Sequence, residues 1–159
     1  MIFVTTGTQL PFDRLIKAMD EIAPHLKKDK IIAQNINGKY KPTNFTCRSY
    51  IDKPEFEEYC RSARLIVSHA GIGSILTALD YGKPIIIMPR YAYLGEHRND
   101  HQIATAMRFH DLGIAKAAYD KRQLHDLIIN SSICPENSYF KPSVSRKLIS
   151  SLQKYIDRT

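Results

Sequence analysis

The sequence predicts an α/β fold, with a Rossmann-like and mainly parallel sheet that is flanked by helices. Strand-like and helix-like segments alternate along the chain, as they do in proteins built from βαβ units. Residues 65–68 are rich in aliphatic side chains, which is typical of a strand buried in a parallel sheet. A glycine-rich turn at residues 68–74 and apolar residues at helical spacing follow directly, so strand, turn and helix succeed one another in the expected order.

In the amino-terminal half, short aliphatic runs indicate strands, and apolar residues three or four positions apart indicate helices. The strands are expected at residues 2–5, 30–34, 46–50 and 65–68. The first helix has Leu15, Ile16, Met19 and Ile22 on one face, and a second helix is expected from about residue 54 to residue 62. Residues 35–38 have the composition of a turn and separate the second strand from the third.

The carboxyl-terminal half continues this alternation. Ile75, Leu76 and Leu79 recur at helical spacing after the glycine-rich turn, and Gly82 with Pro84 supplies the usual helix stop. After this stop we expect a strongly aliphatic strand at 85–88, a loop at 90–99, a helix at 103–110, a short strand at 113–117 and a helix at 121–129.

The last segment of the chain differs in composition from the rest. Residues 1–130 are expected to form one domain, whereas residues 131–142 are polar and contain Pro135 and Pro142, as a connector does. Beyond the connector, an apolar stripe predicts an amphipathic helix that either packs on the domain or docks a partner or a membrane surface. The stripe consists of Val144, Leu148, Ile149, Leu152, Tyr155 and Ile156.

Length and composition limit the class of protein. The 159 residues suit one domain with a single sizeable core, and the hydrophobic fraction of 43% suits a globular chain. There is no run of eighteen apolar residues, and the chain starts with a strand-like segment, so we expect a soluble, cytoplasmic and unprocessed protein. The cysteines Cys47, Cys60 and Cys134 are odd in number and lack ligand spacing, which argues against a disulfide framework and a zinc site.

The formal net charge of +7 indicates attraction to an anionic partner or substrate. The basic residues are dispersed, with small clusters at residues 27–30 and 39–41, and no aromatic stripe of the nucleic-acid-binding type lies among them. The clusters are either solvated faces or a bias toward a membrane surface. Nucleic-acid binding would rest on charge alone, so we expect no nucleic-acid partner.

The glycine-rich turn is a candidate anion site. Gly71 and Gly73 let the backbone approach a ligand at the start of a helix, where free N–H groups and the helix dipole favour negative charge. The alternative is that these glycines only allow the helix to pack on the strand. In an open α/β sheet, ligands bind outside the carboxyl ends of the strands. We therefore expect the loops at residues 6–12, 69–74 and 90–101 to surround one pocket.

Several short motifs follow one another over residues 1–130. They are Thr6-Gly7-Thr8, the sequence SHAGIGS at 68–74, Gly82-Lys83-Pro84, Gly95-Glu96-His97 and Asp100-His101-Gln102. In this order they resemble the carboxyl-terminal half of glycosyltransferase family 28. Within that family the chain is similar to the PssE-type subunits of bacterial exopolysaccharide and capsule synthesis, and to the cytosolic subunit of the eukaryotic dolichol-linked N-acetylglucosaminyl transferase.

This resemblance implies the donor-binding half of a GT-B glycosyltransferase. The chain would be the catalytic, UDP-sugar-binding subunit of a two-component hexosyltransferase that acts on a lipid-linked acceptor. Its partner would be a membrane-anchored, acceptor-binding subunit that holds it at the inner face of the membrane, and neither a cofactor nor a metal ion is expected. The alternative is a non-catalytic nucleotide-sugar-binding or enhancer subunit of such a complex.

The same resemblance implies roles for individual residues. Uracil would lie against the backbone near Ile51, and the Gly71–Ser74 amides, helped by Thr8, would hold the diphosphate. Sugar hydroxyls would contact His101 and Gln102, and other residues of the preceding loop would contact sugar, phosphate or the partner. The donor-binding residues so implied are Thr6, Gly7, Thr8, Ile51, His69, Ala70, Gly71, Ile72, Gly73, Ser74, Thr77, Arg90, Glu96, His97, His101 and Gln102.

Several details qualify these roles. Thr77 stands where the family often has an acidic residue that binds the ribose, and Leu10 stands where many members have glycine. His69 and His101 are the catalytic candidates, and His69 would act either as an imidazolium that stabilises the leaving phosphate or as a neutral hydrogen-bonding group. The general base is expected on the partner. His97 and His101 have HxxxH spacing but no evident third ligand, which argues against a metal site.

Overall fold

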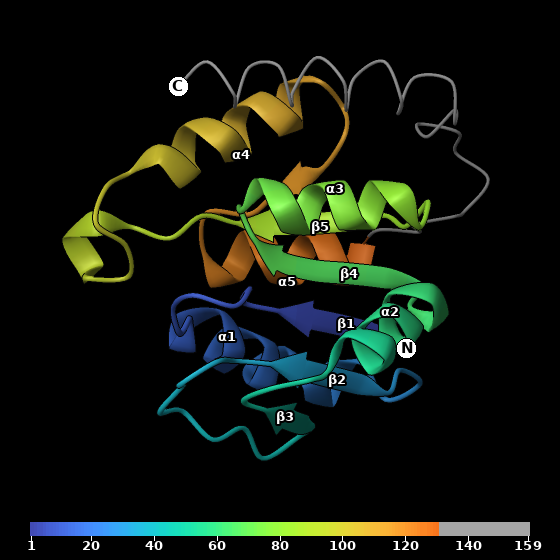
Figure 1. The fold of residues 1–159 in the computed structure, drawn as a ribbon. Coiled ribbons are helices and arrows are strands. Elements are labelled where there is room, and N and C mark those ends of the chain that lie inside the picture. The colour runs from blue at the N-terminus through green and yellow to red at the C-terminus, as the bar shows by residue number, and fades with distance from the viewer. Residues whose placement is uncertain (131–159) are drawn as a thin grey trace.

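The computed structural model describes residues 1–130, and every strand in this part of the chain belongs to one parallel sheet (Figure 1). The order along the sheet is β3-β2-β1-β4-β5-β6. The strands are β1 (Ile2–Thr5), β2 (Ile31–Gln34), β3 (Thr46–Arg48), β4 (Leu65–His69), β5 (Ile85–Met88) and β6 (Lys116–Ala117). All five pairings are parallel, which confirms the predicted fold class.

Helices cover both faces of the sheet. They are α1 (Asp13–Ile22), α2 (Lys53–Ser62), α3 (Ile72–Asp80), α4 (His101–Asp111) and α5 (Lys121–Asn130), with short 3₁₀ turns η1 (Ala23–His25) and η2 (Ala92–Leu94). Side chains of α1 and α5 pack on one face, and those of α2, α3 and α4 pack on the other. Within β1, Ile2 and Val4 join the first cluster and Phe3 joins the second, because successive strand side chains point to opposite faces.

Three strands are shorter than the sequence predicts, and β2, expected at 30–34, lacks only its first residue. The strand expected at 46–50 ends at Arg48, because Arg48 pairs with Gln34, which is the last residue of β2. The strand expected at 113–117 contains only Lys116 and Ala117. The amides of Ile114 and Ala115 instead donate to the carbonyl of Phe109, so these residues close the end of α4.

The helix expected at 103–110 begins two residues earlier, at His101, and ends at Asp111. The predicted connector at 131–142 and the amphipathic helix beyond it lie outside the described residues. Among residues 1–130, no helix combines the length and the apolar character needed to span a membrane.

The order of the strands creates an opening at the carboxyl ends of the central strands. Strand β1 lies between β2 and β4, and the chain leaves β1 toward α1 on one face but leaves β4 toward α3 on the other. The two loops therefore diverge at the carboxyl ends of these strands. This is the topological switch point at which open α/β sheets bind ligands.

Candidate functional site

A cleft of about 400 Å³ lies at the switch point. It is bounded by the loop after β1, by the first turns of α3 and by residues that follow β5, so the three predicted loops do surround one pocket. The predicted site residues that line it are Thr6, Gly7, Thr8, His69, Gly71, Gly73, Ser74, Thr77, Arg90, His97 and Gln102.

The start of α3 presents free backbone donors to this cleft. The first amide of the helix to find a main-chain acceptor is that of Ile75, which donates to the carbonyl of Gly71 over 3.2 Å. The helix begins at Ile72, and both Gly73 and Ser74 line the cleft. Unpaired N–H groups at a helix start favour an anion, and the helix dipole adds to this preference.

Two glycines enclose the imidazole ring of His69. A Cβ atom on Gly71 would lie 2.1 Å from Nε2 of His69, and one on Gly7 would lie 2.7 Å from Cε1. Gly7 also has a φ of +78°, which side-chain-bearing residues rarely adopt. The glycines of two separate loops therefore leave the space that this one side chain fills.

The surroundings of His69 keep its ring neutral. The pKa of His69 is lowered to about 3, first by burial and then by the positive charge of Arg90, while a hydrogen bond with the Thr5 backbone opposes the shift. The hydroxyl of Ser68 lies 3.2 Å from Nδ1. Burial and the nearby charge of Arg90 thus disfavour an imidazolium at His69 near neutral pH.

Arg90 is a buried cation that holds the loop after β1. Its side chain is only 3% exposed, and Nη2 donates to the carbonyls of Thr6 at 2.8 Å and Leu10 at 2.5 Å. Burial lowers its pKa to about 10, against the opposing effect of Glu96, so Arg90 keeps its charge at neutral pH. The guanidinium also lies 5.0 Å from the ring centre of Phe12.

The cleft contains polar groups that the described protein residues leave unpaired. Within residues 1–130, the buried side-chain atoms without a hydrogen-bond partner are Oγ1 of Thr6, Oε1 of Gln34 and Nε of Arg90. All three residues line the cleft. An unpaired buried polar group costs about 1–3 kcal/mol, so their gathering at one place fits a site that is completed by a polar ligand or by water.

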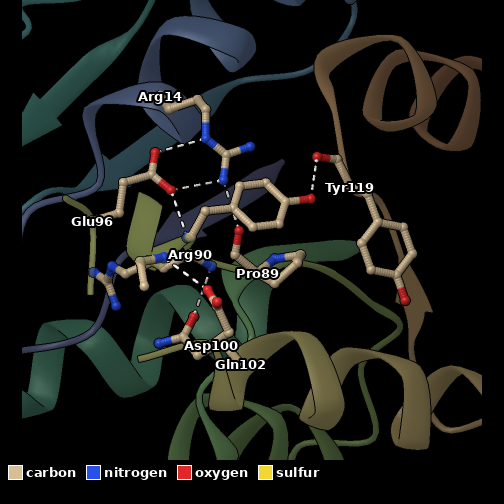
Figure 2. Close-up of polar contacts among 9 residues, drawn as sticks. Arg14, Pro89, Arg90, Glu96, Asp100, Gln102 and Tyr119 are labelled. Atoms are coloured by element: carbon tan, nitrogen blue, oxygen red, sulfur yellow. Dashed lines mark hydrogen bonds and ion pairs between the residues drawn. The ribbon is translucent and has the colours of Figure 1, made fainter. Parts of the chain in front are cut away.

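Other predicted site residues lie outside the cleft lining. The side chains of Ile51 and Ala70 are buried in the core, and Ile72 packs against that core. His101 is exposed at the start of α4. Glu96 is turned toward Arg14 of α1, as Figure 2 shows.

The cleft also contains Gln9 and Leu10 from the predicted loop at 6–12, and three residues that the sequence did not single out, namely Thr5, Gln34 and Phe56. Gln34 carried a signal, because it is a polar residue at the carboxyl end of an otherwise aliphatic strand. Phe56 carried no such signal, because in the sequence it cannot be distinguished from a core residue. In the structure its ring does pack edge-on against Phe3, with the ring centroids 5.1 Å apart.

The polar groups in the cleft are hydroxyls, amides, imidazoles and a guanidinium. Among the described residues that line it there is no Asp or Glu. Residues 1–130 also contain no cluster of three or more His, Cys, Asp or Glu side chains able to hold a metal ion. The described cleft thus has donors for an anion and for hydroxyl groups but lacks a carboxylate base.

Comparison with known proteins gives a consistent picture. The model of the glycosyltransferase family 28 C-terminal domain matches residues 1–151. The human protein named UDP-N-acetylglucosamine transferase subunit ALG13 is 33% identical over an alignment of 122 residues, with a coverage of 70% of this chain and 10% of the human protein. The mouse protein of the same name is 32% identical over 121 residues. The chain therefore spans about a tenth of the length of these curated relatives.

Solved structures share the fold at low sequence identity. The solution structure of ALG13 superposes with a TM-score of 0.62 at 20% identity, covering 92% of this chain and 94% of that one. The kitacinnamycin glycosyltransferase has the same TM-score at 18% identity, and the match covers 94% of this chain but 37% of that one. The fold is thus the Rossmann-like fold of one part of a GT-B glycosyltransferase.

Proposed function

Because the chain belongs to the family of glycosyltransferase family 28 C-terminal domains, we propose that it is the donor-binding catalytic subunit of a two-component glycosyltransferase. The observation that carries this proposal is the cleft at the switch point, where the free amides of α3 adjoin two glycine-containing loops. These amides would hold the diphosphate of a UDP-sugar, with help from the hydroxyl of Thr8.

The remaining groups of the donor would contact the rest of the cleft. Uracil would lie near the Ile51 backbone, on the side where Phe56 lines the cleft, and the ribose would face Thr77. Sugar hydroxyls would contact Gln102 and the histidines at 97 and 101, since amide and imidazole groups both donate and accept hydrogen bonds. The neutral ring of His69 would support the loop and not carry charge.

The names of the relatives support a choice of donor. Both mammalian proteins are UDP-N-acetylglucosamine transferase subunits, so UDP-N-acetylglucosamine is the first donor to test. We propose a lipid-linked acceptor in exopolysaccharide or capsule synthesis, and a location at the inner face of the membrane through the partner.

The second component would supply what the described cleft lacks. In the transfer, an acceptor hydroxyl attacks the anomeric carbon, the bond from that carbon to the diphosphate oxygen breaks, and the hydroxyl proton passes to a base. No carboxylate lines the cleft within residues 1–130, so we assign the base to the membrane-anchored partner. Charge on the leaving UDP would be stabilised by the α3 amides and by buried Arg90, and we propose that no metal ion is needed.

Reconstitution tests this function. The protein is mixed with membranes that contain its partner and with a panel of nucleotide sugars, and sugar transfer to the lipid fraction is measured. We expect transfer from a UDP-sugar only when both components are present, and undiminished transfer in EDTA. Efficient transfer by this chain alone would contradict the two-component proposal.

A pair of variants separates the catalytic subunit from an enhancer. His101→Ala and Gln102→Ala are compared with the wild type in the reconstituted system at saturating donor. A donor-binding catalytic subunit loses turnover when these side chains are removed. Unchanged turnover would favour the enhancer.

A further inference from the structure

The loop between β5 and α4 is fastened to α1 by one ion pair (Figure 2). The carboxylate of Glu96 accepts from Nε of Arg14 at 2.7 Å and from Nη2 at 2.9 Å. It also accepts from the amide of Tyr91 at 2.9 Å. Both side chains are largely buried, with 26% of Arg14 and 14% of Glu96 exposed. A bidentate, partly buried pair of this kind holds its geometry better than an exposed one.

Arg14 is itself held in place by its surroundings. Its Nη2 also donates to the carbonyl of Pro89 at 2.7 Å. One guanidinium therefore binds both Pro89, at the start of the loop, and Glu96, farther along it. The guanidinium lies 4.7 Å from the ring centre of Tyr91 and 5.1 Å from that of Phe12. Arg14 is therefore a fixed anchor and not a mobile surface cation.

The same loop holds cleft residues on its other side. Arg90, His97 and Gln102 line the cleft, whereas Arg14 and Glu96 do not. The amide of Arg90 donates to Oε1 of Gln102 at 3.2 Å, which ties the two ends of the loop together. Displacement of the loop would therefore move three cleft residues at once, and through Arg90 it would also release the loop after β1.

We propose that Arg14 and Glu96 are positioning residues for the donor cleft. They hold the loop from Pro89 to Asp100 against α1 and so fix Arg90 and His97, and through Arg90 also Gln102 at the start of α4, for donor binding. This inference rests on the proposed function, because it assigns the pair a role in binding a UDP-sugar. Neither residue lines the cleft, so their effect passes through the loop.

The test uses the ¹⁵N-labelled protein and the variants Arg14→Gln and Arg14→Lys. We expect faster hydrogen exchange of the Tyr91 amide in Arg14→Gln, because Glu96 loses the partner that keeps it beside that amide. We also expect its affinity for UDP, measured by calorimetry, to fall about tenfold, because the loop that carries Arg90 and His97 is no longer pre-organised for the ligand. Arg14→Lys keeps the charge and should lose less affinity.

A second ion pair of similar geometry provides the control. Arg64 makes a bidentate pair with Asp29, with 2.7 Å from Nε to Oδ1 and 2.5 Å from Nη2 to Oδ2. Arg64 precedes β4 and Asp29 precedes β2, so this pair lies at the amino-terminal ends of the strands, whereas the cleft lies at their carboxyl ends. Arg64→Gln should lower the unfolding temperature without changing the UDP affinity.

Two results would overturn the inference. One is a UDP affinity in Arg14→Gln equal to that of the wild type, and the other is unchanged exchange of the Tyr91 amide. If the wild-type protein binds no UDP, the proposed function fails instead. The exchange measurement still decides in that case whether the pair holds the loop.

Discussion

At the scale of single residues, the cleft depends on two glycines that make room for one histidine. Gly7 and Gly71 come from different loops, yet both approach the ring of His69 more closely than a Cβ atom would allow. Gly73 lies in the same turn as Gly71, but a Cβ atom on Gly73 would have no neighbour within 4 Å among the described residues. The two glycines of this turn therefore have different roles, and substitutions can separate them.

Gly71→Ala should destabilise the protein by about 1–3 kcal/mol, because its methyl group overlaps the His69 ring. Gly73→Ala should be neutral or should stabilise by about 0.5 kcal/mol, since alanine suits a helix better than glycine does. Urea denaturation measures both changes. If the clash is the cause, adding His69→Ala to Gly71→Ala restores part of the loss, and equal stability of the two single variants would refute the explanation.

The low pKa of His69 predicts how stability depends on pH. The unfolded chain binds a proton at this histidine below about pH 6.5, whereas the folded protein does so only near its pKa of about 3. The unfolded state is therefore favoured as the pH falls through this window. We expect the free energy of unfolding to drop by about 2 kcal/mol between pH 6.5 and pH 4.5.

The variant His69→Gln cannot titrate, so most of this pH dependence should disappear in it. Denaturation at several pH values measures the slope for both proteins. The carboxylates with lowered pKa values, such as Asp20 and Asp29, contribute mainly below this window. The same slope in His69→Gln as in the wild type would show that another group is responsible.

At the scale of elements, the long connection between β2 and β3 is held by one buried carboxylate of α1. Asp20 is 4% exposed and accepts from the amide of Asn44 at 2.8 Å, the amide of Thr43 at 3.0 Å and the hydroxyl of Tyr40 at 2.9 Å. Burial by itself would raise the pKa of Asp20, but these hydrogen bonds outweigh it and lower the pKa below its ordinary value.

Asp20→Asn should lower the free energy of unfolding by about 2 kcal/mol, because an amide cannot accept all of these bonds and its NH₂ group lies among donors. Tyr40→Phe removes a single bond and should cost about 1 kcal/mol. Urea denaturation at neutral pH measures both. The order of the two losses is the check, and a larger loss in Tyr40→Phe would contradict this account.

Helix α3 gives a prediction about the nucleoside. Thr77 lines the cleft and donates its hydroxyl to the carbonyl of Gly73 at 2.9 Å. A carboxylate at this position would accept from ribose hydroxyls, so Thr77→Glu should bind UDP about tenfold more tightly. Calorimetry with UDP and 2′-deoxy-UDP measures the change. Thr77→Gln is the uncharged control, and an equal gain for both nucleotides would exclude recognition of the 2′-hydroxyl.

The elements themselves were largely predictable, and the exceptions have local causes. The periodicity of α1 and the aliphatic run at 85–88 each depend on residues close in sequence, and both elements lie where expected. The ends of β3 and β6 depend on distant residues instead. Strand β3 ends at Arg48 because β2 ends at the residue that pairs with it. Residues 114 and 115 hydrogen-bond to the end of α4 instead of continuing β6. A short window of sequence shows neither contact.

At the scale of the whole molecule, donor binding should be visible as stability. A ligand that binds only the folded state at a hundredfold excess over its Kd adds about 2.7 kcal/mol. We expect UDP to raise the unfolding temperature in a concentration-dependent way, and uridine, which lacks the diphosphate, to raise it less. Differential scanning calorimetry measures the shift. Equal shifts of the unfolding temperature with the two ligands would argue against a diphosphate-binding site at the start of α3.

The candidate site shows what sequence can and cannot predict at this scale. The convergence of three loops follows from the rule for parallel sheets, and it was predicted together with the glycine turn. The different roles of Arg90 and Glu96 were not predicted. Both are charged residues of the same loop, so the sequence does not show which of them faces the cleft. Their directions depend on the carbonyl of Leu10 and on Arg14, each about eighty residues away in sequence.

The central place of β1 has a consequence for how the chain folds. Ile2 pairs with Ile31 on one side and with Leu65 on the other, so β1 waits for two strands that are synthesised after it. Until residues 65–69 have left the ribosome, one edge of β1 is an open template for other chains. Pairings this distant also form slowly. The arrangement that opens the cleft thus also leaves β1 with an unpaired edge until β4 has been made.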